Sequence, residues 1–279
     1  MTGAHAAYHG RLAALASCHG KEAAIGPALL QWVGLRLAVP PGIDTDQLGT
    51  FTGEVPRPAS MVETARRKAE MGMAATGLPL GLASEGSFGP HPMVPFLASS
   101  QELLLFKDAE SGIEVIETLQ SDETNIAALD VTPDADLDAF LARVMFPGHA
   151  VVVRAEGRIS KGIRDRAALD RLIAQGLAQG PVRIETDMRA HMNPTRMGEI
   201  AKLAERLARR IATPCPACGT PGFGAVRSEA GLPCSECGAM TRLVRAVIHG
   251  CVQCGYEEQK PRPDGRSEAN PAECELCNP

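Results

Sequence analysis

Aromatic side chains are scarce in this chain of 279 residues, which has seven Phe, two Tyr and one Trp. Proteins that stack the bases of single-stranded nucleic acid need aromatic faces in series, so the scarcity argues against such a platform. The formal net charge of −5 at pH 7 also creates no positive field that would attract nucleic acid or an anionic membrane. The composition therefore disfavours nucleic acid as a partner.

Long apolar runs are absent as well. No stretch of about 18 consecutive apolar residues occurs, which is the minimum length of a membrane-spanning helix. The N-terminal segment lacks the basic region and apolar run of a secretory signal. Hydrophobic residues make up 44% of the chain and charged residues 22%, a balance typical of soluble globular proteins. We therefore expect a cytoplasmic protein that makes no membrane contact.

Cysteine occurs only once before residue 214, at Cys18, which we interpret as a small core residue, with a reactive thiol as the alternative. The other cysteines form four C-x-x-C pairs, and two such pairs complete a tetrahedral Zn²⁺ site. With four thiolate ligands, such a site has no coordination position left for a substrate. In a cytoplasmic chain this regular spacing favours zinc over disulfides or iron–sulfur ligation. We predict two structural zinc ions, held by neighbouring or by crossed pairs; the ligands are Cys215, Cys218, Cys234, Cys237, Cys251, Cys254, Cys274 and Cys277.

Short apolar runs of strand length alternate with helical patterns in the rest of the chain. This order predicts an α/β domain over residues 1–211, with a mixed sheet flanked by helices. It can be divided further into lobes of residues 1–130 and 131–211. A small zinc-ribbon domain with two zinc sites is expected over residues 212–279.

One helix and the strand after it stand out. Ser60 and Glu63 have capping-box spacing, and an apolar stripe then predicts a helix that ends at Gly77. The apolar run Leu78–Ala83 predicts a buried strand, which leads into a polar turn over Ser84–Ser87. The helix would be about 21 Å long and the strand with its turn about 23 Å. A helix that folds back on this strand would therefore bring its first turn beside the end of the strand.

This geometry predicts that Glu63 and Glu85 meet at one edge of the sheet. Two carboxylates beside a glycine-rich turn suit Mg²⁺ or Mn²⁺ and leave positions for phosphate oxygens. The competing interpretation is that Glu63 is only a capping residue. A carboxylate at the end of a strand, such as Glu85, is more typical of a functional site.

A second feature is the strand, glycine loop and helix start around Ser17, His19 and Lys21. Unpaired N–H groups at a helix N-terminus attract anions, and Lys21 would add positive charge, although an exposed lysine is an equal alternative. Six basic residues within Arg154–Arg171, with the core Gly157–Gly162, could hold phosphate or form a solvated face. The polar residues of Glu185–Arg196 form another candidate site or an ordinary loop.

Two resemblances accompany these patterns. The first resemblance is carried by the C-x-x-C tail and by three segments: GTFTGEVPR at Gly49–Arg57, SEGSFGPHP at Ser84–Pro92 and TDMRAHMNPTRM at Thr186–Met197. In these features the chain resembles an uncharacterised bacterial family with an α/β domain and a double zinc ribbon. Residues 10–120 distantly resemble the inosine/xanthosine triphosphate pyrophosphatases, which cleave nucleoside triphosphates with Mg²⁺. The similar segments are Ser17–Lys21 (phosphate loop), Glu63–Ala69 (E-N-A-x-x-K-A) and Ser84–Ser87 (acidic turn).

These observations lead to the hypothesis of a metal-dependent phosphohydrolase or pyrophosphatase that acts on a nucleotide-like substrate. Glu63 and Glu85 would hold the metal, while Lys21 and Lys68 would hold phosphate. We assign substrate binding to Ser17, His19, Arg67, Ser84, Gly86, Ser87 and His91, with a structural role as the alternative for His91. The other hypothesis is a non-enzymatic adaptor whose zinc ribbon binds a protein partner, since six Lys/Arg against eight Asp/Glu after residue 211 disfavour nucleic acid.

Overall fold

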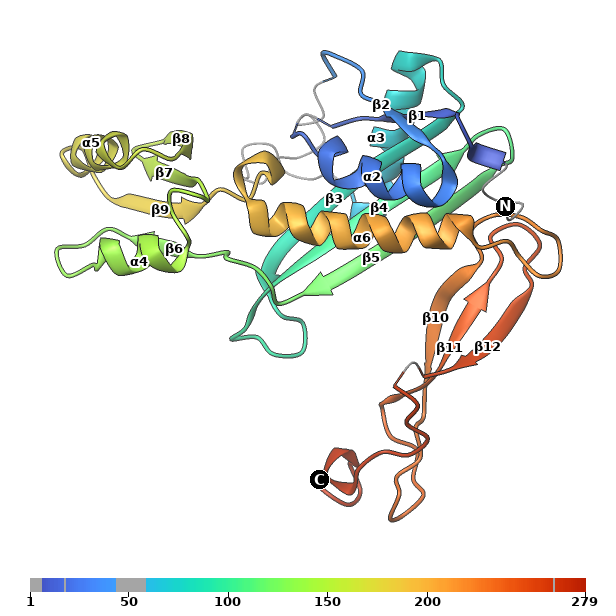
Figure 1. Cartoon of the computed structure of the whole chain (residues 1–279). Helices are drawn as coiled ribbons and strands as arrows, with labels where there is room; N and C mark the ends of the chain where they lie inside the picture. The colour runs from blue at the N-terminus through green and yellow to red at the C-terminus, as the bar shows by residue number, and fades with distance from the viewer. Residues whose placement is uncertain (1–6, 18, 44–58, 263) are drawn as a thin grey trace.

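The computed structural model describes residues 7–17, 19–43, 59–262 and 264–279. Cys18 and the Gly49–Arg57 motif lie outside these ranges. The chain forms three bodies (Figure 1): the first lobe (the described residues up to 121, with 194–212), the second lobe (residues 128–186) and the zinc arm (residues 213–279). In the described residues, no helix is long and apolar enough to span a membrane.

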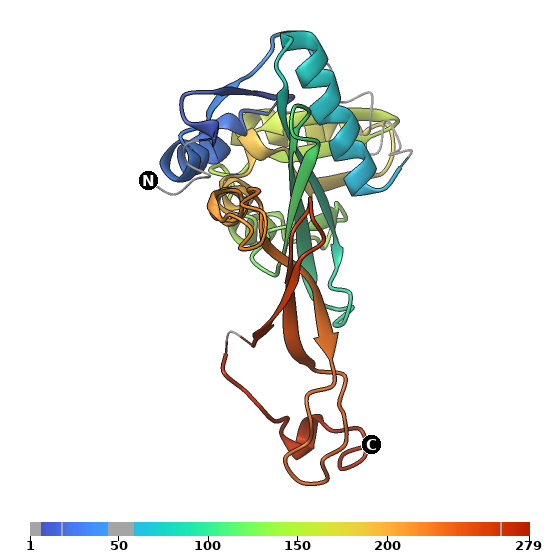
Figure 2. The same cartoon turned by 90° about the vertical axis from the view of Figure 1, so that its right-hand side faces the viewer.

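The first lobe contains a mixed five-stranded sheet between helices. Its strand order is β2 (Arg36–Ala38), β1 (Leu12–Leu15), β3 (Leu80–Pro90), β4 (Ala98–Asp108) and β5 (Ile113–Ser121). Strand β1 is parallel to β2 and β3, whereas β3, β4 and β5 are antiparallel. Helices α2 (Glu22–Val33) and α6 (Pro194–Ala212) cover one face, and α3 (Met61–Thr76) covers the other (Figure 2).

Alternation along β3 divides its side chains between these two helical layers. Leu80 and Leu82 belong to the core beneath α2 and α6, while Ala83 packs with Ala65 and Ala69 of α3. Successive side chains of a strand point to opposite faces. Ser84 therefore lies on the α2/α6 side and Glu85 on the α3 side, which determines what each of them contacts.

The second lobe is an antiparallel sheet with two helices. Its strand order is β6 (Ala128–Asp130), β9 (Val182–Thr186), β7 (Val151–Ala155) and β8 (Arg158–Ile163), with α4 (Leu137–Arg143) and α5 (Arg166–Leu177). The 3₁₀ helix η2 (Ala190–Met192) leads back to α6. Helix α6 packs its apolar face in the core of the first lobe, and the second sheet begins with β6 at Ala128, so the structure divides the chain differently from the predicted lobes 1–130 and 131–211.

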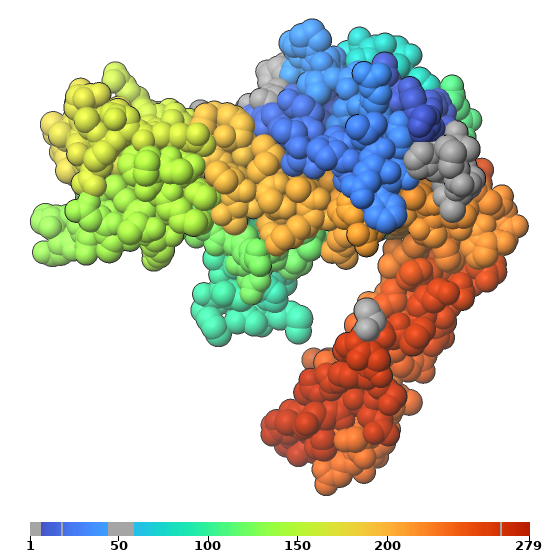
Figure 3. Space-filling view, in the orientation of Figure 1, coloured from blue at the N-terminus to red at the C-terminus, as the bar shows by residue number. Residues whose placement is uncertain are grey.

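The zinc arm projects from the body (Figure 3). It consists of the antiparallel strands β10 (Gly224–Ala230), β11 (Val244–Gly250) and β12 (Glu257–Pro261), followed by the 3₁₀ helix η3 (Pro271–Glu273). One end of the β10–β11 pair is next to α6, and the other end is far from the body (Figure 1).

Two segments predicted as turns or loops are strands. Strand β3 continues without interruption through Ser84–Ser87, because each of these residues pairs with β4. The basic core at Gly157–Gly162 lies mostly in β8, which pairs with β7. The α/β class with sheets flanked by helices is confirmed, but it comprises separate sheets in the two lobes.

Candidate functional site

The eight tail cysteines form two tetrads, and the pairing is crossed. The proximal tetrad, near the body, combines the first and third C-x-x-C pairs, and the distal tetrad combines the second and fourth. The Sγ atoms of Cys215 and Cys254 are 3.8 Å apart, and those of Cys237 and Cys274 are 3.7 Å apart. Four sulfurs about 2.3 Å from a central Zn²⁺ would be separated by about 3.8 Å in a tetrahedron. Both tetrads therefore fit a zinc ion.

These tetrads suit structural rather than catalytic zinc. Each has two buried and two exposed cysteines, and four thiolates leave no position open for a substrate. The two sites lie at opposite ends of the β10–β11 pair, since Cys251 follows β11 directly and Cys234 follows β10. Zinc bound in these two tetrads would therefore stabilise both ends of the arm.

A cluster of buried charged groups surrounds the middle of β3. On the α3 side, Lys68 Nζ is 2.5 Å from Glu85 Oε1, and both side chains are nearly inaccessible. On the α2 side, Lys21 Nζ donates to the Ser84 carbonyl at 3.1 Å and lies 3.2 Å from its hydroxyl. The structure thus brings together three of the four residues predicted as catalytic, around a strand interior instead of a turn.

Arg196 and Glu102 extend this cluster on the α2/α6 side. Arg196 Nε donates to Glu102 Oε1 at 2.7 Å, and both side chains are 1% exposed. The guanidinium carbon of Arg196 also lies 4.9 Å from the centre of the Phe88 ring. Gly86 leaves room for this pair, because a Cβ atom there would be 2.5 Å from Arg196 Nη2. No side chain other than hydrogen fits at Gly86 without displacing Arg196.

Glu63 lies apart from this cluster, which corrects the predicted pair of metal ligands. Ser60 caps the start of α3 as expected, because its Oγ accepts the N–H of Glu63 at 3.2 Å. The Glu63 carboxylate, however, pairs with Arg66 and Arg67 on the helix surface. Arg66 reaches Glu114 on β5, whereas Lys68 turns toward β3. Helix α3 therefore holds Glu63 over the β5 side, away from Glu85.

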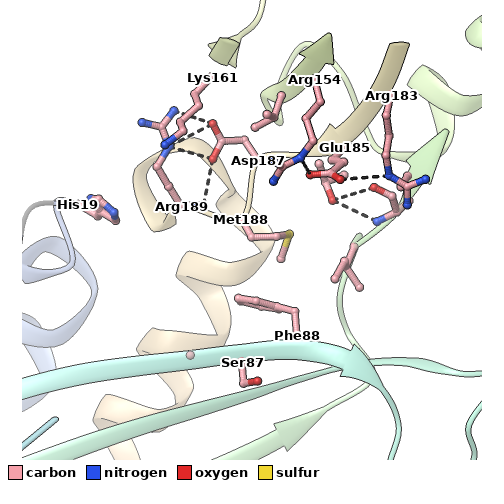
Figure 4. Close-up of a pocket in the computed structure, with 16 residues that line it drawn as sticks. His19, Ser87, Phe88, Arg154, Lys161, Arg183, Glu185, Asp187, Met188 and Arg189 are labelled. Atoms are coloured by element: carbon pink, nitrogen blue, oxygen red, sulfur yellow. Dashed lines mark hydrogen bonds and ion pairs between the residues drawn. The ribbon is translucent and has the colours of Figure 1, made fainter. Parts of the chain in front are cut away.

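A cavity of about 520 Å³ lies between the two lobes, and we call it the interlobe cavity (Figure 4). Its first-lobe wall comes from the loop before α2 and from the part of β3 beyond the cluster. Its opposite wall comes from the second lobe and the segment before η2. The lining residues are His19, Gly86, Ser87, Phe88, Ile126, Ala127, Ala128, Val152, Arg154, Lys161, Arg183, Glu185, Thr186, Asp187, Met188 and Arg189.

Four cationic side chains of this lining face two carboxylates. Arg154 and Arg183 both donate to Glu185, at 2.8 Å and 3.1 Å. Arg189 Nη2 donates to Asp187 at 2.6 Å. Burial raises the pKa of Asp187, but the hydrogen bonds from Arg189 and Gly162 outweigh it, so the pKa falls below its usual value. With Lys161, the wall carries more positive than negative side chains.

An apolar surface lies beside these cations. Phe88 and Met188 approach each other across the floor of the cavity in Figure 4, and Ile126, Ala127 and Val152 line it as well. The Ser87 side chain points to the other face of β3. The cavity therefore combines an apolar floor with a cationic wall, which is the usual composition of a small-molecule site.

The remaining predicted site residues have mixed positions. His19 lines the cavity, its N–H lies 3.4 Å from Ser17 Oγ, and its ring is 5.1 Å from that of His191. His91 does not line the cavity; its Nδ1 accepts the N–H of Met93 in the β3–β4 loop, which favours the structural role. Arg67 is half exposed on α3 and pairs with Glu63.

Several lining residues were not predicted from the sequence. Phe88 and Met188 lie inside the quoted motifs, but an apolar side chain there gives no sign of a site. Ile126 lies in no motif, and Arg183 looks like an ordinary surface residue of a strand. The sequence marks Lys161 as part of the basic run Arg154–Arg171 and Glu185–Arg196 as a polar segment, but no sequence spacing connects either of them to Gly86. In the described residues, no group of three carboxylate or imidazole ligands is arranged for a metal ion; only the cysteine tetrads are.

Comparison with known proteins yields one match. A family model described as a domain of unknown function, DUF6671, matches residues 68–279, which includes β3, the second lobe and the zinc arm. No curated protein and no solved structure matches the chain. The distant resemblance of residues 10–120 to pyrophosphatases therefore stays a prediction.

Proposed function

The chain belongs to the DUF6671 family, whose function is unknown, and we propose that it is a hydrolase acting on a nucleotide-like phosphorylated substrate in the interlobe cavity. The observation that carries this proposal is the composition of one cavity: Arg154, Lys161, Arg183 and Arg189 beside an apolar floor with Phe88. Phosphate groups require cationic donors, and a sugar or base requires apolar surface. A volume of about 520 Å³ lies within the range of small-molecule sites.

The cavity cations support phosphate binding because they are already held in place. Glu185 orients Arg154 and Arg183, and Asp187 orients Arg189. A guanidinium that is positioned by one carboxylate keeps other N–H groups for a phosphate oxygen. Less conformational entropy is then lost when the ligand binds.

In this proposal the substrate touches the cavity cations, while Glu85 and Lys68 hold β3 in place beneath it. Glu85 is 3% exposed and its carboxylate is occupied by Lys68, which leaves it poorly placed to contact a ligand. Mg²⁺ or Mn²⁺ would neutralise phosphate charge, and we expect it to arrive with the substrate, since no described carboxylate cluster fits it.

The test uses the full chain with its zinc and a panel of nucleoside di- and triphosphates with Mg²⁺ or Mn²⁺. Binding is followed by calorimetry and turnover by the phosphate and pyrophosphate released. We expect Lys161→Gln to weaken binding roughly tenfold, which corresponds to about 1.4 kcal/mol. Arg171→Gln is the matched control, because Arg171 is an exposed residue of α5 that does not line the cavity.

The proposal is overturned if no nucleotide binds saturably, or if the Lys161 and Arg171 variants bind equally well. Binding without turnover by any member of the panel would retain the ligand class and remove the hydrolase activity. The two parts of the proposal are thus tested by separate measurements.

A second candidate, an adaptor that binds a protein through the zinc arm, is favoured by the apolar residues near the distal tetrad. Met240 is 68% exposed and Leu276 is 75% exposed. The double variant Met240→Ser/Leu276→Ser should keep both zinc ions and lose cross-linking to a partner in cell extract. Equal cross-linking by the wild type and the variant would remove this candidate.

A further inference from the structure

The buried cluster around β3 has one more cation than it has carboxylates among the described residues. Lys68 is paired with Glu85, and Arg196 with Glu102. Lys21, which is 7% exposed, makes its hydrogen bonds to the neutral oxygens of Ser84. The side chains that face it from β3, α3, β4 and α6 are the four charged groups already paired with one another. Within the described part of the chain, a charged Lys21 would therefore be a buried cation without a carboxylate of its own.

Such a charge is unfavourable in a poorly solvated interior. Arg196 cannot release a proton in proteins, whereas a lysine can. Burial and, next, the charge of Arg196 together lower the pKa of Lys21 to about 7, against the opposing effects of Glu102 and Glu85. The unliganded cluster can thus remain neutral overall when Lys21 is an uncharged amine.

Lys21 also lies directly behind the wall of the interlobe cavity. It follows His19 and Gly20 in the chain, and His19 lines the cavity. Its partner Ser84 is two residues before Gly86 on the same face of β3, and Gly86 lines the cavity too. An anion at this end of the cavity would supply the negative charge that the cluster lacks.

We propose that binding of an anion in the interlobe cavity is coupled to uptake of one proton by Lys21. This inference rests on the proposed phosphate-binding function and adds a residue that does not contact the ligand but responds to its charge. The proton comes from solvent and forms the third N–H bond of the Lys21 ammonium, so the anion and the proton enter together. By linkage, the affinity for the anion should fall as the pH rises above the value at which the Lys21 ammonium of the unliganded protein loses its proton.

The experiment is calorimetric titration of the full chain with inorganic sulfate, a dianion that takes up no proton itself at neutral or alkaline pH. Titrations at about pH 8 in buffers of different ionisation enthalpy give the number of protons taken up per anion bound. We expect most of one proton for the wild type and almost none for Lys21→Met. Lys21→Gln, which keeps a donor for Ser84, serves as a second variant if Lys21→Met folds poorly.

His19 and His191 are the other groups near this end of the cavity that could take up a proton. Burial lowers the pKa of His191 below its usual value of 6.5, so taking up a proton at about pH 8 would need a larger rise in pKa for His191 than for Lys21. His191→Gln should therefore leave the proton uptake unchanged. Sulfate binding with no proton uptake, or equal uptake by the wild type and Lys21→Met, overturns the inference and leaves the proposed function intact. If neither sulfate nor any nucleotide binds, both proposals fall.

Discussion

The zinc arm and the first lobe are stabilised by different means. The buried cluster at the base of the arm consists of Cys215, Phe223 and Cys251, so two of its three members belong to the proximal tetrad, which fits a zinc ion. The first lobe instead has a continuous apolar core shared by β1, β3, β4, α2 and α6. Small domains with little buried apolar surface need a metal or disulfides to fold. The arm should therefore depend on zinc, and the first lobe on packing and on its buried charges.

The largest effect should come from breaking the proximal tetrad. Cys251→Ser removes one thiolate, and we expect the metal content to fall from two zinc ions to one. Structural zinc sites contribute about 10–16 kcal/mol of apparent binding energy that is also folding energy. Hydrogen exchange should show that β10 and β11 lose protection. Because Arg210 of α6 contacts the Gly222 carbonyl beside this tetrad, the end of α6 should also loosen.

The matched variant is Cys274→Ser in the distal tetrad. It should also remove one zinc ion, but it should leave the protection of α6 unchanged, because the distal tetrad lies far from the body. If zinc is lost but the whole arm keeps wild-type protection from hydrogen exchange in both variants, the arm does not depend on its metal.

The second prediction concerns the buried pair Arg196–Glu102. Removing one member leaves a buried charge without its partner, so Arg196→Met should destabilise the first lobe by about 3–5 kcal/mol. Adding Glu102→Leu should recover most of this loss, because the second unpaired charge is then removed. Trp32 is the only tryptophan and packs against the first-lobe core, so its fluorescence during urea unfolding reports this lobe.

Arg209→Met is the control on the same helix. Arg209 is paired with Glu205 at the surface, where ion pairs contribute little. Because its guanidinium carbon also lies 4.7 Å from the centre of the Trp32 ring, unfolding of this variant is followed by circular dichroism. If Arg209→Met and Arg196→Met cost the same, burial of the Arg196 pair would not be the reason for its effect.

The difference between the two regions also explains what the sequence could predict. The tail cysteines stand at short, regular spacings, so a short stretch of sequence is enough to predict that they bind zinc. Only the crossed pairing required the structure. Helix α3 of the first lobe was predictable from its Ser60 cap and its apolar stripe. These features depend on neighbours in the chain.

The interlobe cavity depends on distant contacts, and sequence reasoning found only parts of it. The segment Ser84–Ser87 has the composition of a turn, but its residues pair with β4 and continue a strand. Its polar side chains can be buried there because Lys21 and Lys68 contact Ser84 and Glu85. Likewise, nothing local places Lys161 opposite Gly86. Their proximity follows from how the two lobes meet, which no periodicity encodes.

A third prediction uses the pH dependence of first-lobe stability. In the unfolded chain, Lys21 keeps its proton up to its ordinary pKa of 10.5, whereas in the folded protein its pKa is about 7. Between these values the unfolded state binds more protons, so the free energy of unfolding should rise with pH. Lys21→Met should flatten this rise. Urea unfolding at several pH values, followed by Trp32 fluorescence, measures it; identical slopes in both proteins would contradict a buried, uncharged Lys21.

The smallest effect should come from Glu63, and it separates the two carboxylates that the sequence placed together. Among the described residues, Glu63 pairs with the half-buried Arg66 and the exposed Arg67 of its own helix, so Glu63→Ala should cost about 0.5 kcal/mol or less. It should also leave nucleotide binding unchanged. Glu85→Gln leaves Lys68 buried without its counter-charge, and it should destabilise the first lobe far more. If Glu63→Ala instead abolished turnover of a nucleotide, Glu63 would be a substrate or metal ligand after all, and the catalytic centre would have to lie over α3 and not between the lobes.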